Sequence, residues 1–330
     1  MKLKEDEKMN VKRKSFLFGL AGVVAAGFIA GCTQSDAIRV GSYNIRTGGA
    51  DKETPNAWKE RKDDLVALLK KMDLDVFGLQ EVMPAQAEFL REKLPEYDYV
   101  GEFRNEDRVS GEASPVCYRK DRFEALKSGT FWLSETPDVP GLKGWGAACP
   151  RVCSYLILRD KRTGVKFCFA NTHTDHVSAL AREKGMMLIL ERMKKFGEGA
   201  PIVFTGDHNC RETDVPAIAV SGVLTNALYA CETTPTGSWR TFNGWEWREN
   251  EVSTVEALKA TPEVRNARSG SPDGTGRKKE TYGARIDYIY VTPGTRVLDY
   301  STIDATRPGT QLYPSDHFPL MATVSFNTGK

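Results

Sequence analysis

Short apolar runs that stop abruptly at polar clusters are the feature that most limits how this chain can fold. Residues 38–45 alternate like a strand, and residues 76–79 run almost directly into Glu81. Residues 201–204 likewise end just before Asp207. Such runs are typical of strands, and several follow one another without a helical segment between them. The pattern favours mixed or antiparallel sheets with outer helices over a doubly wound parallel sheet.

The periodicity of apolar residues predicts the remaining elements. Helical spacing is found at residues 58–72, 85–94 and 179–196. Further strands are predicted at residues 115–118, 123–133, 285–291, 297–303 and 320–326, with a hairpin formed by 154–158 and 165–171. Two stretches rich in Gly or Pro, residues 134–148 and 267–283, are predicted to be surface loops.

The N-terminal segment has the pattern of a signal peptide. Lys12, Arg13 and Lys14 precede an uncharged, mostly apolar stretch over residues 15–30, and Cys32 follows Gly31. The stretch is shorter than the roughly 20 residues that a membrane-spanning helix needs. It resembles a bacterial lipobox, so we expect a signal peptide at residues 1–31, a lipidated Cys32 with a short tether at 32–37, and one domain at 38–330. The protein would be exported and lipid-anchored at a bacterial membrane, on its periplasmic or cell-surface face.

Charge gives a weak indication about partners. The whole chain carries +2, while residues 1–31 hold six Lys/Arg and three Asp/Glu, so residues 32–330 come to about −1. Non-specific nucleic-acid binding depends mainly on a broad positive field, which this domain lacks. Nothing in the sequence specifies an oligomer, so we expect a monomer.

The cysteines other than Cys32 give no clear disulfide or zinc pattern. The four-residue separation of Cys149 and Cys153 is not a zinc-knuckle spacing. An exported protein could pair some of its thiols, but free buried thiols are the favoured interpretation.

All four histidines lie in short polar clusters near predicted strand ends, and each has an Asp within two residues. The clusters are Asn171-Thr172-His173-Thr174-Asp175-His176, Gly206-Asp207-His208-Asn209 and Ser315-Asp316-His317. Scattered core histidines would not be expected to group in this way. For His176 and His208, an ordinary surface or core position remains an equal alternative.

Carboxylates at strand ends indicate a cation site. A buried carboxylate must be paired or must bind a cation, and hard divalent ions prefer oxygen ligands. Asn44, Glu81, Asp207 and Asp316 can supply such oxygens. Zinc bound through the histidines is the competing hypothesis, and it is weaker because the chain has no tight Cys/His set.

Six motifs in this order resemble the endonuclease/exonuclease/phosphatase superfamily. They are Ser42-Tyr43-Asn44-Ile45-Arg46, Leu79-Gln80-Glu81-Val82, Asn171-Thr172-His173, Gly206-Asp207-His208-Asn209, Arg285-Ile286-Asp287-Tyr288-Ile289 and Ser315-Asp316-His317. Each is weak alone, but all six in order over residues 38–324 form a specific match. The resemblance implies an α+β fold, a DNase I-like four-layer αββα sandwich with its site at one end.

The resemblance also implies roles for these residues. Glu81, Asn44 and Asp316 would hold Mg²⁺, with Mn²⁺ as a substitute. The catalytic residues would be His173, Asp207, Asn209, Asp287 and His317, with Asp207 and Asn209 positioning or deprotonating water, and Asp287 holding His317. Arg151 is a candidate phosphate clamp and Asp175 a second candidate for substrate binding. An ordinary salt bridge from Asp287 to Arg285 is the alternative for that carboxylate.

Two classes of function remain open. One is a Mg²⁺-dependent hydrolase of phosphate esters, acting on nucleic acid, an inositol phosphate or a phospholipid head group. The other is a non-catalytic lipoprotein that uses the fold to bind a glycan or a protein. Its feature would be the aromatic patch of Trp239, Phe242, Trp245 and Trp247, although part of this patch is expected in the core.

Overall fold

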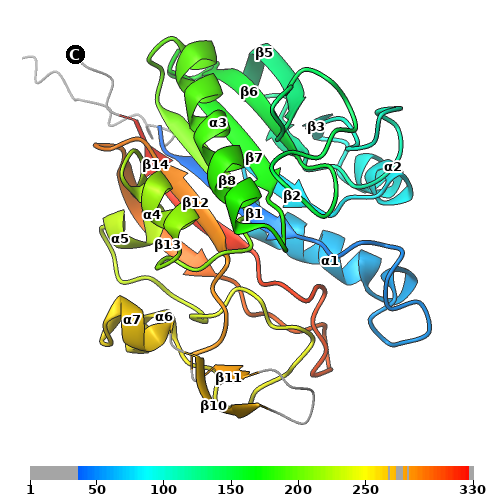
Figure 1. The fold of residues 1–330 in the computed structure, drawn as a ribbon, viewed down its shortest axis with the longest axis vertical. Helices are drawn as coiled ribbons and strands as arrows, with labels where there is room; N and C mark the ends of the chain where they lie inside the picture. The colour runs from blue at the N-terminus through cyan, green and yellow to red at the C-terminus, as the bar shows by residue number, and fades with distance from the viewer. Residues whose placement is uncertain (1–35, 267, 273–277, 281, 327–330) are drawn as a thin grey trace, which may run out of the picture. The chain divides into compact units, whose positions relative to one another are not determined.

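Two six-stranded sheets form the centre of the fold in the computed structural model, which describes residues 36–266, 268–272, 278–280 and 282–326 (Figure 1). The first sheet contains β1 (Ile38–Asn44), β2 (Val76–Gln80), β3 (Tyr97–Val100), β4 (Val116–Arg119), β13 (Arg296–Thr302) and β14 (Leu320–Ser325). The second contains β5 (Phe123–Trp132), β6 (Val152–Asp160), β7 (Lys166–His173), β8 (Ile202–Asp207), β9 (Thr225–Asn226) and β12 (Asp287–Val291).

Both sheets are mixed, as the sequence predicts. The strand orders are β13-β14-β1-β2-β4-β3 and β5-β6-β7-β8-β12-β9. Parallel pairing joins β1 to β2 and β7 to β8, while the other strand pairs in these two sheets are antiparallel. Each parallel pair is at the centre of its sheet, so its two carboxyl ends meet at one edge.

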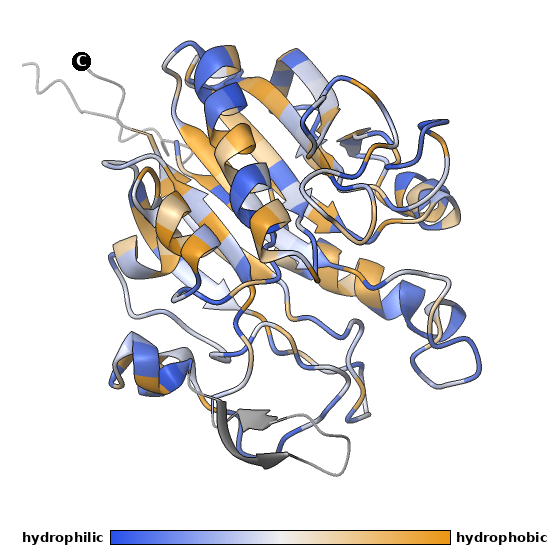
Figure 2. Ribbon diagram, viewed as in Figure 1, coloured by the Kyte–Doolittle hydropathy of each residue, from blue (hydrophilic) through white to orange (hydrophobic). Residues whose placement is uncertain are grey.

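Four helices cover the outer faces of the two sheets. On the first sheet they are α1 (Trp58–Met72) and α2 (Pro84–Lys93), and on the second they are α3 (Ala179–Gly197) and α4 (Val215–Ser221). The short helices α5 (Ala227–Ala230), α6 (Thr254–Leu258) and α7 (Pro262–Arg265) follow, and α5 and α6 pack against the apolar residues between the sheets. Figure 2 shows apolar residues along the central strands and both apolar and hydrophilic residues on α3. This alternation is typical of a helix that packs one face on a core.

Three apolar layers hold the sandwich together. Between the sheets, residues such as Val40 and Val76 pack with Phe169 and Ile289. The layer under α1 and α2 includes Leu65 and Leu69 of α1, and the layer under α3 includes Met186 and Ile189. Three cores between four layers confirm the predicted α+β, four-layer αββα sandwich.

The loop predicted over residues 267–283 is in part wrong. Its described residues include β10 (Arg268–Pro272) and β11 (Lys278–Glu280), which form an antiparallel two-stranded sheet. The segment does not alternate in hydropathy, so no local pattern marks these strands.

A buried polar network joins the sheets close to the predicted site. Asn171 of β7 donates through Nδ2 to the carbonyl oxygens of Leu79 (2.7 Å) and Pro115 (2.9 Å), and its Oδ1 accepts from Gln80 Nε2 (2.7 Å). A Cβ at Gly78 would lie 2.2 Å from this amide, so glycine is needed for the close approach. Asn171, part of one of the family motifs, therefore has a structural role: it fixes β2 against β7, directly behind Glu81 and His173.

A second buried link between the sheets gives a stability prediction. The guanidinium of Arg122 donates to Asp75 Oδ2 at 2.7 Å and to Asp160 Oδ2 at 2.9 Å, and its side chain is only 3% exposed. Asp75 precedes β2 of the first sheet and Asp160 ends β6 of the second, so Arg122 links the two sheets through these carboxylates. Substituting Arg122→Ala should lower the free energy of unfolding by about 3–5 kcal/mol, because it leaves buried carboxylates unpaired.

Urea denaturation measures this effect, with Arg159→Ala as the matched control. Arg159 pairs with Glu124 at the surface, where an exposed ion pair contributes less than about 1 kcal/mol. Equal losses for the two variants would contradict a structural role for the buried link.

The N-terminal predictions lie outside the described residues. Residues 1–31 and Cys32 are among those that the structure does not describe, and the described fold starts shortly before β1. Within the described part of the chain, no helix combines the length and apolar character needed to cross a bilayer. The six cysteines of the described residues are all free thiols, as favoured from the sequence.

Candidate active site

The predicted site residues converge because the strands that carry them are in register at one edge. In the second sheet His173 of β7 lies beside Asp207 of β8, and Asp207 lies beside Asp287 of β12. In the first sheet Asn44 ends β1 beside Gln80, and the chain then turns at Glu81 with a φ of 62°. The left-handed turn lets the residue after β2 leave the strand direction.

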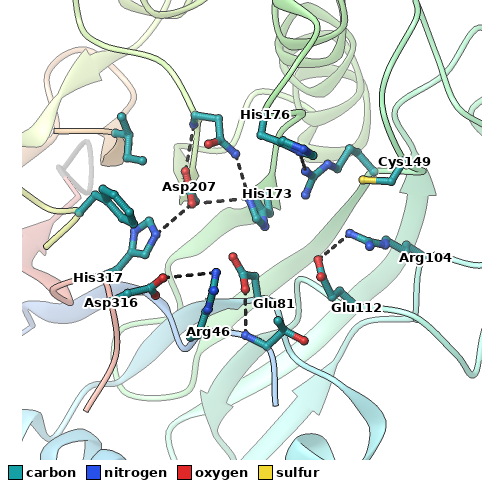
Figure 3. A pocket seen from close by; sticks show the side chains of 15 residues that line it. Arg46, Glu81, Arg104, Glu112, Cys149, His173, His176, Asp207, Asp316 and His317 are labelled. Carbon is teal, nitrogen blue, oxygen red and sulfur yellow. Dashed lines mark hydrogen bonds and ion pairs between the residues drawn. The ribbon is translucent and has the colours of Figure 1, made fainter. Parts of the chain in front are cut away.

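A cavity of about 390 Å³ opens at this edge (Figure 3). Its lining combines carboxylates, histidines and arginines: Arg46, Thr47, Glu81, Arg104, Glu112, Cys149, Arg151, His173, His176, Asp207, Asn209, Phe242, Ile286, Asp316 and His317. Seven predicted site residues are among them. Asn44, Asp175 and Asp287 do not line the cavity and contact residues that do.

Asp207 is at the centre of the polar contacts. Its Oδ2 accepts from Asn44 Nδ2 at 2.9 Å, and its Oδ1 accepts from the Asn209 amide nitrogen at 2.9 Å. The same Oδ2 lies 3.5 Å from His173 Nε2 and 3.6 Å from His317 Nε2. Burial, reinforced by the charge of Asp287, raises the pKa of Asp207 to about 7. A carboxylate with a pKa near neutrality suits proton abstraction from water.

His317 is held by Asp287 in the predicted manner. Its Nδ1 lies 2.9 Å from Asp287 Oδ2. Burial alone would lower the pKa of His317, but the carboxylates of Asp287 and Asp207 outweigh burial and raise the pKa to about 10. The ring is therefore a protonated donor at neutral pH. Arg285 instead donates to the Trp239 carbonyl oxygen and the Tyr300 hydroxyl, so the alternative salt bridge with Asp287 is wrong.

His173 has the opposite character. The Asn209 side-chain amide lies 2.9 Å from His173 Nε2 and 3.1 Å from the Thr174 carbonyl oxygen. Because that carbonyl can only accept, the amide must donate, and His173 Nε2 is then an acceptor. Burial, followed by the charge of Arg151, lowers the pKa of His173 well below its usual range. The neutral ring carries its proton on Nδ1, which is buried without a hydrogen-bond partner.

Two carboxylates in the cavity suit a hard cation. Glu81 accepts from Asn44 Nδ2 (3.1 Å) and the Thr47 amide nitrogen (2.8 Å), which leaves each carboxylate oxygen with further acceptor capacity. Burial raises the pKa of Asp316, and the charge of Glu81 adds to this effect. A bound cation would relieve that repulsion. The oxygen donors fit Mg²⁺ better than zinc.

Asn44 is placed differently from Glu81 and Asp316. It is fully buried, and its Oδ1 accepts from the Arg46 amide nitrogen at 3.0 Å. Its amide nitrogen binds both Glu81 and Asp207, so it orients the two carboxylates. A role as a direct metal ligand stays a prediction.

Arg151 lines the cavity, and Asp175 contacts it from outside the lining. Arg151 Nη2 donates to His176 Nδ1 at 2.8 Å, and its Nε lies 3.6 Å from Asp175 Oδ2. Asp175 accepts from the amide nitrogens of Ala148, Val177 and Ser178. Asp175 does not line the cavity, and substrate binding by Asp175 stays a prediction.

Several cavity residues were not predicted from the sequence. Arg46 follows β1 and lies 3.4 Å from Asp316 Oδ2, so its place in the first motif was a usable signal. Arg104 and Glu112 pair with each other from a loop that has no recognisable pattern. Of the aromatic patch, Phe242 contacts His317 edge-on, Trp239 is in the core and Trp247 is exposed.

His208 is buried in an aromatic cluster with Phe204, Tyr288 and Tyr290, and both ring nitrogens lack hydrogen-bond partners. Burial lowers the pKa of His208 to about 3, despite the opposing charge of Asp287. The unfolded state therefore takes up a proton below about pH 6.5, while the folded state does not. This histidine should make the fold less stable as the pH falls from about 6.5 towards 3.

Replacing this ring tests the effect. The free energy of unfolding of His208→Phe, relative to the unsubstituted protein, should rise by about 2 kcal/mol between pH 7 and pH 5. Chemical denaturation at the two pH values measures the change, and groups shared by both proteins cancel. A difference that does not depend on pH would contradict the assignment.

The sandwich and the carboxylate–histidine cavity at its strand ends together define a DNase I-like phosphoester hydrolase. A sequence model of the Endonuclease/Exonuclease/phosphatase family matches residues 41–317. The chain belongs to this family, whose members hydrolyse phosphate ester bonds. The family is typically dependent on a divalent metal, and Asp207, Asp287 and His317 bring potential ligand atoms within 4.8 Å of one another.

Two solved structures are similar over nearly the whole domain. An endonuclease/exonuclease/phosphatase family protein from Bacteroides thetaiotaomicron is 32% identical, with a TM-score of 0.72 over 89% of this chain and 96% of that one. A mannosyl-6-phosphatase of the same organism is 33% identical, with a TM-score of 0.71 over 88% and 100% of the two chains.

Curated relatives are more distant. Tyrosyl-DNA phosphodiesterase 2 of Danio rerio is 25% identical over 158 residues, which is 47% of this chain and 38% of that protein. The chain spans between 27% and 59% of the length of five curated relatives.

Proposed function

We propose that the protein is an exported, Mg²⁺-dependent hydrolase of phosphate esters that acts by in-line attack of water on phosphorus. The observation that carries this proposal is the set of contacts around Asp207. One carboxylate is oriented by Asn44 and Asn209 and lies within 3.6 Å of both His173 and His317. A binding module would not need a buried carboxylate held at a pKa near 7 beside a protonated imidazole.

Each residue has a distinct task in the proposed reaction. Asp207 accepts a proton from water as the water oxygen bonds to phosphorus, and Asn209 fixes the Asp207 carboxylate. The bond from phosphorus to the leaving alcohol breaks, and the alcohol oxygen takes up a proton from solvent or an acidic group. His317, protonated through Asp287, and His173 Nδ1–H donate to the non-bridging oxygens, whose charge grows in the transition state.

Glu81 and Asp316 would hold the divalent ion, with Asn44 orienting Glu81. When bound, Mg²⁺ would supply positive charge beside the phosphoryl oxygens and the leaving group. Mn²⁺ is the expected substitute because it also accepts carboxylate and water ligands.

The substrate range is proposed from chemistry and from relatives. Nucleic acids, inositol phosphates and phospholipid head groups all present a phosphate ester to such a cavity. The mannosyl-6-phosphatase relative adds sugar phosphates. The near-neutral domain supports a small phosphate ester over long nucleic acid, which is held mainly through a positive surface.

A substrate panel tests the proposal. Residues 36–330, which form one compact unit, would be incubated with mannose 6-phosphate, an inositol phosphate, single-stranded RNA, plasmid DNA and sphingomyelin, each with Mg²⁺ or EDTA. Turnover of at least one substrate with Mg²⁺, and none with EDTA, is the expected result. A folded protein that turns over none of them with Mg²⁺ or Mn²⁺ would favour the non-catalytic binding lipoprotein.

We also propose that Cys32 is lipidated after removal of residues 1–31, so that the enzyme is held at a bacterial membrane outside the cytoplasm as a monomer. The support is the basic, apolar and small-residue order that ends at Cys32. The unsubstituted protein should incorporate labelled palmitate and sediment with membranes, whereas Cys32→Ser should do neither. Palmitate label that persists in Cys32→Ser would contradict lipidation at this residue.

A further inference from the structure

Arg151 is a buried cation whose charge is incompletely compensated. Its side chain is 6% exposed, and its Nε makes no hydrogen bond. The nearest carboxylate oxygen, Asp175 Oδ2, lies 3.6 Å away. Its Nη2 donates to His176 Nδ1, a ring nitrogen that must be unprotonated to accept and so contributes no negative charge there. A buried charge of this kind is costly unless an anion completes its contacts.

The other two cavity arginines are better paired. Arg46 donates to Asp51 Oδ2 at 3.1 Å and lies 3.4 Å from Asp316, while Arg104 donates directly to Glu112. Asp175 compensates Arg151 less closely, because its Oδ2 lies 3.6 Å from Arg151 Nε and accepts no hydrogen bond from it. Arg151 therefore differs from its neighbours in having unused donor capacity at the cavity wall.

Arg151 lines the same cavity as His173, Asp207 and His317. After burial, the charge of Arg151 is the largest cause that lowers the pKa of His173. Figure 3 shows His176, Cys149 and Arg104 on the side of the cavity opposite His317 and Asp207. A phosphate in the cavity would thus meet donors on two sides, and the predicted metal ligands Glu81 and Asp316 line the same cavity.

We infer that Arg151, positioned by Asp175 and His176, binds the third non-bridging oxygen of a phosphate monoester and makes monoesters the preferred substrate class. This inference rests on the proposed function. A monoester has three non-bridging oxygens and up to two negative charges, so His317, Arg151 and the predicted cation can each receive one oxygen. A diester has two such oxygens and one charge, and its second alcohol would lie against a guanidinium that needs an anion. The planar fork of arginine suits phosphate oxygens.

The first test compares p-nitrophenyl phosphate with bis-p-nitrophenyl phosphate in the presence of Mg²⁺. The unsubstituted protein should have the higher kcat/KM for the monoester. Arg151→Met should lower that value by about 10- to 100-fold, as expected for loss of a charged hydrogen-bond donor, and should change the diester value much less. Arg151→Lys should lie between, because it keeps the charge without the fork. Arg159→Met, a surface arginine on the neighbouring β6, should change neither value.

The second test measures binding without turnover. Calorimetry in EDTA would compare inorganic phosphate with dimethyl phosphate at pH 8, where the first is mainly a dianion. The unsubstituted protein should bind inorganic phosphate more tightly, and Arg151→Met should lose most of that preference while keeping its circular dichroism spectrum. If Arg151→Met does not fold, the same comparison of inorganic phosphate with dimethyl phosphate is made with Arg151→Lys and with the unsubstituted protein. These two results then test the role of Arg151.

The outcomes separate the two proposals. Equal losses for monoester and diester in Arg151→Met, or equal binding of the two phosphates by the unsubstituted protein, would overturn the role of Arg151 and leave the hydrolase intact. Absence of turnover of every phosphate ester with Mg²⁺ or Mn²⁺, in a folded protein, would instead overturn the proposed function.

Discussion

Substituting Asp207→Asn should lower kcat by about 10²- to 10⁴-fold, the range expected when a general base is removed. The amide has nearly the same size as the carboxylate but cannot accept a proton from water. The carboxylate of Asp207 accepts one hydrogen bond from Asn44 and one from Asn209, each on a different oxygen. The amide has a single oxygen, so it can keep only one of these two contacts in the same geometry. Initial rates with a substrate that the panel identifies would measure the loss.

The same variant should be at least as stable as the unsubstituted protein. Burial and the charge of Asp287 raise the pKa of Asp207 to about 7, well above its value in an unfolded chain. The folded state therefore holds this proton more tightly, and ionisation of Asp207 costs stability as the pH rises from about 4 through 7. A neutral amide does not incur that cost above pH 7.

The surface variant Asp138→Asn is the matched control, because the Asp138 side chain pairs with Arg192 and is 80% exposed. It should change neither kcat nor the melting temperature by a measurable amount. If Asp207→Asn kept normal turnover, or lost it only through unfolding, the role of Asp207 would be wrong.

Substituting Glu81→Gln should weaken Mg²⁺ binding by at least about 10- to 100-fold. This is the loss expected when a residue that only hydrogen-bonds to a metal ligand is removed, and Glu81 is predicted to bind the metal directly. Glu81 is the carboxylate that lines the cavity at the end of β2, and its charge faces Asp316. Gln keeps the side-chain shape but removes the negative charge that the ion needs. Hydrolysis should fall together with Mg²⁺ affinity.

Calorimetry and thermal unfolding measure this effect without a substrate. A ligand at 100 times its Kd stabilises the folded state by about 2.7 kcal/mol, so Mg²⁺ should raise the melting temperature of the unsubstituted protein and EDTA should remove the gain. Glu112→Gln is the matched control, because this cavity carboxylate is already paired with Arg104. Normal Mg²⁺ affinity in Glu81→Gln, with a loss in Glu112→Gln, would place the metal elsewhere in the cavity.

The predicted elements that were found with the right bounds are those with strong local patterns. The helix over residues 58–72 matches α1 because Leu65, Leu68 and Leu69 repeat at helical spacing and pack on one face. The strand ends that carry Glu81 and Asp207 could be predicted for a similar reason. A buried strand that stops at a carboxylate is visible from neighbouring residues alone.

Elements without a local pattern could not be predicted. The helices α4 to α7 are four to seven residues long, and helices this short depend on tertiary contacts instead of their own sequence. The strand β9 has two residues and exists only as a partner of β12. Such elements follow from the packing of the domain.

The unpredicted part of the site has the same physical origin. Arg104 reaches the cavity because the loop between β3 and β4 folds back on β5, where Trp132 Nε1 donates to the Arg104 carbonyl oxygen at 2.6 Å. Phe242 reaches it through a bridge to His317, 75 positions away in the chain. No spacing within a single sequence reports contacts of this range. Arg151 was found only through its residue type, and the structure adds its incomplete compensation.

The measurement that tests the central claim most directly is hydrolysis of p-nitrophenyl phosphate in ¹⁸O-labelled water with Mg²⁺, followed by mass spectrometry of both products. Attack of water on phosphorus predicts one ¹⁸O in each released phosphate and none in the p-nitrophenol. Release of labelled phosphate should stop with EDTA, and its rate should fall by about 10²- to 10⁴-fold in Asp207→Asn. Label in the p-nitrophenol, or release of phosphate that depends neither on a divalent ion nor on Asp207, would contradict the account.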